Sequence, residues 1–520
     1  MFASARDPLS ASMAVLIVIG WWFAASGWGQ QPNKPSEPAG AKGNQPVYYG
    51  AGTCADCHSL DDPKKVRGLP PVLCRCNEFP IWDKKDKHKV AYTNLFKPGS
   101  QGKQMQKLLC YSDHDVQTKC VVCHGVYIPD DKIAAWTDSS FKRDQSEGVS
   151  CVACHGADIG GDRSWIDQHG SATNRNRERW RKLSRQTKET EYGMIDLWDP
   201  AKRARKCASC HVGSVPEGKV VTHAMYAAGH PPLPGLEVST FSDAMPRHWQ
   251  YLAEKSDEAK KLLEYKPGVP ERTDLLLIGG LVDLEESMDL LASQAEHCAR
   301  AKEAEDRSLD LAVFDCYACH HDLKTRSWRQ ERGYVGKPGR PQFRPWPTAL
   351  LQVSLHAAQE DANRTGSQAT LDNLRKAFGE TPFGKPEQVA VAARALQKWA
   401  QDFHPKLAAA GQRLDRSALT GLLLEVCKLA ASETWDYDSA RQLAWAFQVI
   451  HADLHSNAAD QPAVAETING LNKLLKLELP HGQEQNIMSE LPDALARIAD
   501  YDPRTVKKHF QRLEELIGQR

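Results

Sequence analysis

Apolar residues recur at intervals of three and four along most of the last third of the chain. The pattern is clearest in four segments, which we expect to form amphipathic helices: 388–400, 418–431, 439–450 and 504–517. Asp415 and the pair Asp502-Pro503 are typical of helix starts. We therefore predict six to eight antiparallel helices, packed as a helical bundle domain over residues 346–520.

The pattern changes on the N-terminal side of Trp346-Pro347. Between residues 47 and 345, Gly, Pro and Asp interrupt the chain often, helical stretches are short, and strand-like alternation is rare. These features predict a mainly α fold with little regular sheet. They also leave few apolar side chains to form a core for this part of the chain.

Two further segments precede this region. An apolar stretch, 13–25, follows Arg6 and ends in small residues, so residues 1–29 are expected to be a signal peptide. The alternative is an uncleaved anchor, because the uncharged stretch is barely long enough to span a bilayer. Residues 30–46 are rich in Pro, Gly and polar residues and predict a flexible linker. With either interpretation, the body of the protein leaves the cytoplasm.

Composition adds two limits. The 520 residues allow two or three domains. Lys plus Arg and Asp plus Glu number 66 each, so no nucleic-acid partner is indicated.

Five copies of the motif Cys-x-x-Cys-His stand in the segment 47–345, and we number them first to fifth in chain order. They are Cys54-Ala-Asp-Cys57-His58, Cys120-Val-Val-Cys123-His124, Cys151-Val-Ala-Cys154-His155, Cys207-Ala-Ser-Cys210-His211 and Cys316-Tyr-Ala-Cys319-His320. In a chain with 15 Cys and 19 His, chance predicts about 0.02 such matches. Each motif is typical of covalent haem c attachment, in which two thiols bond to the porphyrin edge and the adjacent His binds the iron.

Other interpretations of these cysteines are weaker. A zinc site does not require His directly after each second Cys. A disulfide framework needs no His, and a thioredoxin-type motif occurs once in a fold. Five attached haems also explain the missing apolar core, because porphyrins take its place. The sequence thus predicts a haem-packed multihaem cytochrome c domain over residues 47–345, located in the periplasm or otherwise exported.

The first three motifs stand in a recognisable sequence context. Asp86-Lys-His88 follows the first motif, Gly125 and Gly156 follow the second and third, and Glu147-Gly-Val-Ser leads into the third. In order and context, the segment from about residue 47 to residue 235 resembles the cytochrome c-554 family. Members of that family are tetrahaem periplasmic cytochromes that take electrons from hydroxylamine oxidoreductase.

The resemblance implies further iron ligands. In that family three haems have two His ligands, and the second haem in sequence is five-coordinate. His169 then matches the second ligand of the first haem, and His88 that of the third. Either His223 or His230 matches the second ligand of the fourth haem.

The haem of His124 has no matching second ligand in the family. His114 lies ten residues before His124 and is a candidate here, so an open and a filled site both remain interpretations. For the fifth haem the candidates are His248, His297 and His321. Since His321 is adjacent to His320, the two side chains cannot bind one iron from opposite faces. The histidines of the helical region, His356 among them, are expected to be surface or core residues.

Two functions follow from these features. The favoured one is an electron carrier between redox partner proteins, in nitrogen-oxide or respiratory metabolism. The alternative is an oxidoreductase that acts on hydroxylamine, nitrite or nitric oxide at a five-coordinate haem of His124. The Cys-x-x-Cys-Lys motif typical of pentahaem nitrite reductases is absent from the sequence, which argues against that enzyme.

Five cysteines lie outside the motifs: Cys74, Cys76, Cys110, Cys298 and Cys427. In an oxidising compartment some are expected to pair, and the odd number leaves at least one unpaired. Cys427 is expected in the core of a helix. A basic run at 175–185 has three interpretations: a solvated helix, a docking surface for an acidic redox partner, or a clamp on haem propionates.

Overall fold

The structure is a computed structural model. It describes residues 50–60, 73–128, 146–157, 163–170, 174–303, 307–320, 337–359, 361–455, 461–477 and 500–519. The predicted signal peptide or anchor, 1–29, and the predicted linker, 30–46, lie outside these ranges. Among the described residues, no helix has the length and apolar character needed to cross a membrane.

The described part of the chain is mainly helical, as predicted. It contains no strand, and its β-structure is limited to two isolated bridges, Ser214 with Lys219 and Phe314 with Phe343.

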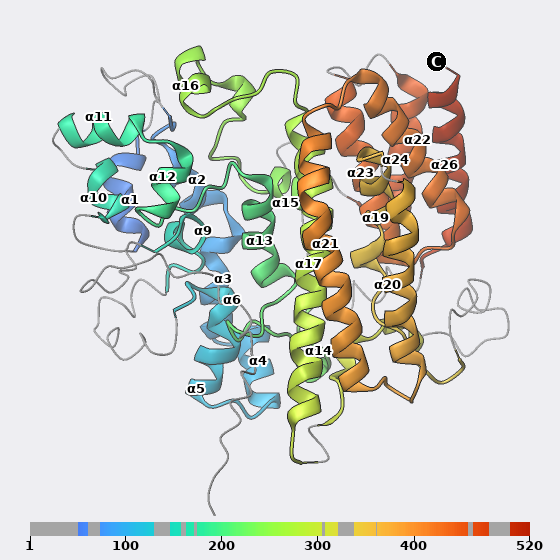
Figure 1. Cartoon of the computed structure of the whole chain (residues 1–520). Coiled ribbons are helices and arrows are strands. Elements are labelled where there is room, and N and C mark those ends of the chain that lie inside the picture. The colour runs from blue at the N-terminus through green and yellow to red at the C-terminus, as the bar shows by residue number, and fades with distance from the viewer. Residues whose placement is uncertain are drawn as a thin grey trace, which may run out of the picture. The chain divides into compact units, whose positions relative to one another are not determined.

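Short helices build the region that carries the first four motifs (Figure 1). They are α1 Ala51–His58, α2 Glu78–Lys85, α3 Ala91–Phe96, α4 Gln101–Leu108, α5 Asp113–Val116, α6 Val122–His124, α9 Cys151–His155, α10 Trp165–Gly170, α11 Asn174–Lys182, α12 Arg185–Thr190, α13 Pro200–His211, α14 His223–Ala227, α15 Val238–Ala244 and α16 Asp257–Leu262. Several begin at a Ser, Thr or Asp whose side chain accepts a backbone N–H, as Asp199 does from Lys202 at the start of α13. Local capping thus sets where these helices start.

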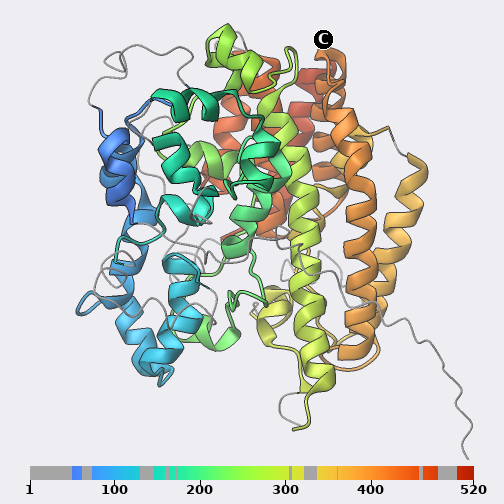
Figure 2. The same cartoon turned by 60° about the vertical axis from the view of Figure 1, so that its left-hand side comes forward.

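A single long helix, α17 Glu271–Arg300, follows them. It packs against α13 and, most extensively, against α21 Pro386–Gly411. Figures 1 and 2 show α17 and α21 side by side in both views. Two glycines permit close neighbours on α17: a Cβ at Gly279 would lie 2.1 Å from Cγ1 of Val238, and one at Gly280 would lie 3.0 Å from Cβ of Leu350.

The last third of the chain forms the predicted antiparallel helices. They are α19 Leu351–Ala357, α20 Asp361–Gly379, α21, α22 Arg416–Ser432, α23 Tyr437–Leu454, α24 Pro462–Leu474 and α26 Pro503–Gly518. The four segments chosen from apolar periodicity all fall inside helices. Asp415 and Asp502 cap α22 and α26 as expected, by accepting the N–H groups of Ala418 and Arg504.

The buried apolar side chains are distributed unevenly. The largest cluster in the described part runs from Ala201 to Ile517 and includes α13, α17, α21 and α23. Before residue 200 there are two small clusters, one around Leu95, Val116 and Val121, the other around Trp165, Trp180 and Tyr192. The main core therefore crosses position 345, where the sequence predicted a domain boundary. That division stays a prediction.

Candidate haem-binding sites

Each motif ends in or just after a helical turn. The first, third and fourth motifs lie in α1, α9 and α13, which end at His58, His155 and His211. The second runs from a π-helical turn, Gln117–Val121, into α6, and the fifth begins in a 3₁₀ turn, Cys316–Ala318. On a helix, residues three and four apart share a face, so the two thiols and the imidazole of a motif lie on one side.

Burial keeps three of the motif histidines neutral. It lowers the pKa of His124, His155 and His211 to about 4, and a second histidine near each lowers it further. A neutral imidazole at pH 7 has a nitrogen lone pair available for a metal. These nearby second histidines are His230, His248 and His88 respectively.

Four of the five motif histidines lie opposite a second histidine in ring contact. The distances between ring centres are 6.1 Å for His58 and His169, 6.4 Å for His124 and His230, 6.3 Å for His211 and His88, and 6.3 Å for His320 and His223. All four distances fall within a narrow interval, although the pairs come from different elements.

This separation fits one iron between two imidazoles. A metal–imidazole bond of about 2 Å and a ring radius of about 1.2 Å place the two ring centres about 6.4 Å apart on opposite faces of a metal. The histidines present therefore fit haem iron with two His ligands. Sequence reasoning named all eight residues of these pairs, but it did not find all of the pairings.

His169 faces His58, the placement that the resemblance implies, and its role as an iron ligand stays a prediction. His88, which the resemblance assigns to the third motif, lies against His211 of the fourth motif instead. His223 and His230, both expected near the fourth motif, instead face His320 and His124. The short helix α14 and the turn after it thus serve two different motifs.

Of the two interpretations of the His124 site, open or filled, the geometry favours a filled one, because His230 faces His124. His114, the other candidate there, is exposed on α5. The resemblance could not reveal His230 in this role, since the family's pattern has no second ligand for that haem.

His248 is the histidine near the remaining motif. It lies close enough to His155 to lower the pKa of that imidazole, second only to the effect of burial. Its Nδ1 lies 3.4 Å from the carbonyl oxygen of Pro246. His248, His297 and His321 were the candidates for the fifth haem, but His223 faces His320 of that motif instead. His297 is exposed on α17, and His321 lies outside the described residues.

Most of the paired histidines have a hydrogen-bond partner at Nδ1, which leaves Nε2 for a metal. The partner is a carboxylate for His58 (Glu78, 2.8 Å) and His88 (Asp86, 3.0 Å). It is a backbone carbonyl oxygen for three others: Ala91 for His124 at 3.3 Å, Trp165 for His169 at 2.8 Å and Pro231 for His230 at 2.7 Å. These contacts fix the orientation of each ring.

Sulfur contacts join the motifs in pairs. The Cys54 thiol of the first motif contacts Cys151 of the third, and Cys123 of the second contacts Cys210 of the fourth. Motifs far apart in sequence therefore present neighbouring attachment points.

Residues 53–156, which hold the first three motifs, match the family model described as Cytochrome c554 and c-prime. This segment belongs to the cytochrome c554 family. No curated protein and no solved structure matches the chain. The cytochrome c554 segment identifies the protein as a c-type cytochrome, with covalently bound haem c and a general role in electron transfer with redox partners.

The structure explains the family-like residues of the cytochrome c554 segment. The Glu147 carboxylate accepts the N–H of Ala51 at the start of α1, and the Val149 N–H donates to the carbonyl of His88. Gly148, at φ +75°, lets this segment approach the His88 backbone: a Cβ there would lie 2.5 Å from the His88 carbonyl oxygen. The Glu-Gly-Val lead-in therefore positions both α1 and His88.

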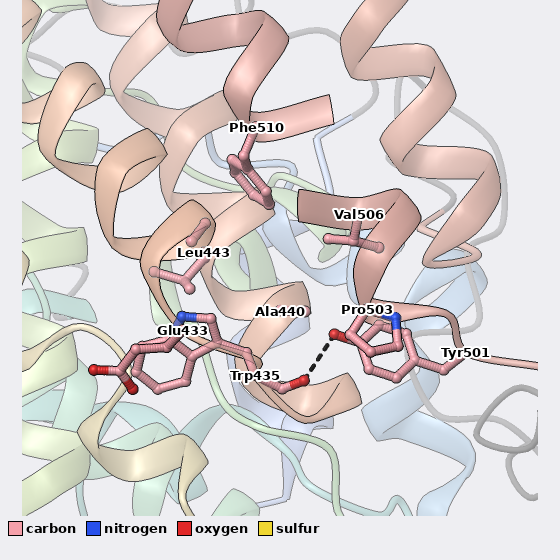
Figure 3. A pocket seen from close by; sticks show the side chains of 9 residues that line it. Glu433, Trp435, Ala440, Leu443, Tyr501, Pro503, Val506 and Phe510 are labelled. Carbon is pink, nitrogen blue, oxygen red and sulfur yellow. Dashed lines mark hydrogen bonds between the residues drawn. The ribbon is translucent and has the colours of Figure 1, made fainter. Parts of the chain in front are cut away.

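A small hollow also lies between α22, α23 and α26 (Figure 3). Trp435, Leu443 and Phe510 are among its lining residues, and the Tyr501 hydroxyl donates to the Trp435 carbonyl at 2.9 Å. Its lining contains no His or Cys, and we interpret it as a packing feature of the helices. Cys427, expected in the core, is fully buried in α22.

Proposed function

We propose that the chain is an exported pentahaem cytochrome that transfers electrons between redox partner proteins. The observation that carries the proposal is the second histidine that faces four of the five motif histidines at the separation of a two-histidine iron site. An iron with two His ligands has no free position for a substrate, which favours a carrier over an enzyme.

The residues of the chain hold and orient the cofactors. Ten motif cysteines would supply the thioether bonds, and the four histidine pairs would supply the ligands of four irons. Carboxylate and carbonyl partners at Nδ1 set the ring orientations and the basicity of the ligands. Bound haem c supplies a one-electron couple at its iron. The two sulfur contacts support close packing of the first with the third site and of the second with the fourth.

The small apolar clusters before residue 200 support haem packing around the first three motifs. Leu95, Val116 and Val121 form a cluster too small to stabilise a region of this length by burial alone. Covalently held porphyrins would supply the missing apolar surface, which is the physical reason why the sequence lacked it.

Partner docking involves the basic helix α11 in this proposal. Trp180 on α11 lies 6.0 Å, centre to centre, from the ring of His169, so the helix covers the first site. Its exposed Arg179 therefore lies near that site, where a basic surface would attract an acidic redox partner. The role in nitrogen-oxide or respiratory metabolism is part of the proposal and follows from the family resemblance.

The alternative function, reduction or oxidation of a small nitrogen compound at the haem of His124, needs an open iron position. His230, at 6.4 Å between ring centres, argues against it.

His230→Ala provides the test. The variant should convert one haem in five from low spin to high spin, as seen by visible absorption and paramagnetic resonance, and that haem should bind cyanide. His114→Ala is the control and should leave the wild-type spectrum unchanged. A wild-type protein with one high-spin haem in five that His230→Ala does not alter would contradict the proposal and favour the enzyme.

A further inference from the structure

Two cysteines outside the motifs lie together just before α2. The sulfur atoms of Cys74 and Cys76 are 3.4 Å apart, and Cys76 has a positive φ of +58°. Of the five cysteines outside the motifs, these two have a sulfur partner in the structure. The exported compartment inferred above allows such a pair to become a disulfide.

The turn that contains this pair is connected to the ligand of the first motif. The N–H of Arg75, the residue between the two cysteines, donates to Oε1 of Glu78 at 2.6 Å. Oε2 of the same carboxylate accepts from Nδ1 of His58 at 2.8 Å. One continuous set of contacts therefore runs from the cysteine pair through Glu78 to the proximal imidazole.

The position of the turn is fixed from two other sides. The Leu60 N–H donates to the Cys76 carbonyl at 2.8 Å, and the Lys255 ammonium donates to the Leu73 carbonyl at 2.8 Å. Both ends of the turn are therefore held in place. If the sulfur atoms of Cys74 and Cys76 move closer together, the peptide of Arg75 between them must rotate.

A metal ion is the other ligand that this cluster suggests. Ligand atoms of His58, Cys74 and Glu78 lie within 4.8 Å of one another. However, Nδ1 of His58 is engaged by Glu78, and its ring faces His169 across the separation that fits an iron. The cluster therefore belongs to the surroundings of the first site and is not a separate cation site.

We propose that Cys74 and Cys76 form a reversible disulfide whose state controls how Glu78 contacts His58, and thereby the reduction potential of the first haem. The inference rests on the proposed function and names a regulatory site within it. Oxidation joins the two sulfurs and passes two electrons and two protons to a low-molecular-weight disulfide such as oxidised glutathione, which leaves as two thiols. A dithiol reductant reverses the step.

The contacts of Glu78 predict the direction in which the reduction potential of the first haem changes. With both thiols free, Glu78 accepts the His58 N–H, which makes the imidazole a stronger electron donor and favours the oxidised iron. Bond formation requires the sulfurs to approach each other, which turns the Arg75 peptide and weakens its hold on Glu78. The disulfide form should therefore have the higher potential at the first haem.

Peptide mapping tests the bond itself. Trypsin cleaves after Arg75 and places the two cysteines on different peptides, so only a disulfide keeps them linked. The exported protein, digested without reductant after treatment with oxidised glutathione, should give the linked pair, and dithiothreitol should release it. Two separate, fully alkylated peptides after oxidation would overturn the proposal.

Spectroelectrochemical titration tests the effect on the haem. One of five transitions should lie at higher potential in the disulfide form than in the dithiol form, after removal of the reagents. Cys74→Ser should abolish the difference, and Glu78→Gln should raise that transition and make it independent of the thiol state. Cys110→Ser, at an exposed cysteine, is the control and should keep the difference.

Equal potentials in both forms would overturn the regulatory role. The haem count by mass and the spin state by paramagnetic resonance are separate measurements. Five low-spin haems without a thiol effect would leave the carrier function intact, whereas missing haems would contradict the carrier function itself.

Discussion

Gly148 shows how one residue positions a ligand from a distant part of the chain. Its φ of +75° favours glycine, and a Cβ would lie 2.5 Å from the carbonyl oxygens of both His88 and Lys89. The residue lies just before the third motif, yet its contact is with the histidine that faces the fourth.

Gly148→Ala should therefore displace His88. We expect one high-spin haem in five, with a loss of stability of about 1–3 kcal/mol from backbone strain and steric overlap. Visible and paramagnetic resonance spectra measure the first effect, and denaturant unfolding measures the second.

Gly99→Ala is the matched control. Gly99 has the same φ of +75°, but no heavy atom lies within 4 Å of the Cβ position. This variant should show backbone strain without a high-spin haem. Identical spectra for the two variants would show that Gly148 does not hold His88.

Residue identities at the sites were largely predictable, but most pairings were not. The spacing of Cys, Cys and His carries the chemistry of each motif, so the attachment residues follow from the sequence. A second ligand is brought to its motif by the fold. His230 faces His124 across 105 intervening sequence positions, and no local pattern encodes that contact. His248 had no local signal that distinguished it from His297.

At the scale of elements, α17 carries acidic side chains into the interior. Asp283 is 1% exposed. Burial, followed by the neighbouring Glu285 carboxylate, raises the pKa of Glu286 to about 7, although Arg205 lowers it in part. A carboxyl group with a raised pKa in the folded state stabilises the fold less as it ionises.

Glu286→Gln should accordingly change the pH dependence of stability. The wild type should lose stability as the pH rises from about 4.5, the ordinary pKa of Glu, to about 7, and remain constant above. The variant should lack this loss and be more stable at pH 8 by about 1–2 kcal/mol, after allowance for partial exposure. Unfolding by denaturant at pH 5, 6.5 and 8 provides the measurement.

Glu296→Gln, on the same helix, is the comparison. Its hydrogen bond with Arg394 lowers the pKa of Glu296, so the carboxylate stays ionised between pH 6 and pH 8. Replacing the Glu296 carboxylate should reduce the free energy of unfolding by a constant amount between pH 6 and pH 8. A pH-independent effect of Glu286→Gln would contradict the interpretation of that residue.

Helix α17 was also the element that sequence reasoning missed. Its first half reads Leu275-Leu-Leu-Ile-Gly-Gly-Leu-Val282, and the two adjacent glycines are unfavourable in a helix. Tertiary packing against Val238 and Leu350 explains them, and those contacts cannot be read from local propensity. By contrast, α21, α22, α23 and α26 have clear apolar periodicity and strong caps, and they were found.

At the scale of the whole molecule, the continuous core ties the C-terminal helices to the haem-bearing part. Leu277, Leu281 and Leu284 of α17 are each at most 2% exposed and belong to the cluster that also contains α21 and α23. A chain that ends at residue 345 would expose much of this surface to water.

Expression of residues 47–345 behind a standard export signal should therefore give an insoluble or unstable product. The haem-stained protein in the soluble fraction measures the outcome, and we expect a loss of most of it. A chain that starts at residue 44, behind the same signal, is the control and should stay soluble, because residues 44–520 form one compact unit. A soluble 47–345 product with five haems would establish the boundary that the sequence predicted.

The two sulfur contacts, Cys54 with Cys151 and Cys123 with Cys210, also constrain how the protein matures. Once these thiols lie against each other, porphyrins bonded to them share one small region of the fold. Attachment of haem before the chain folds would avoid crowding there. The order of haem attachment and folding is therefore expected to matter for this protein.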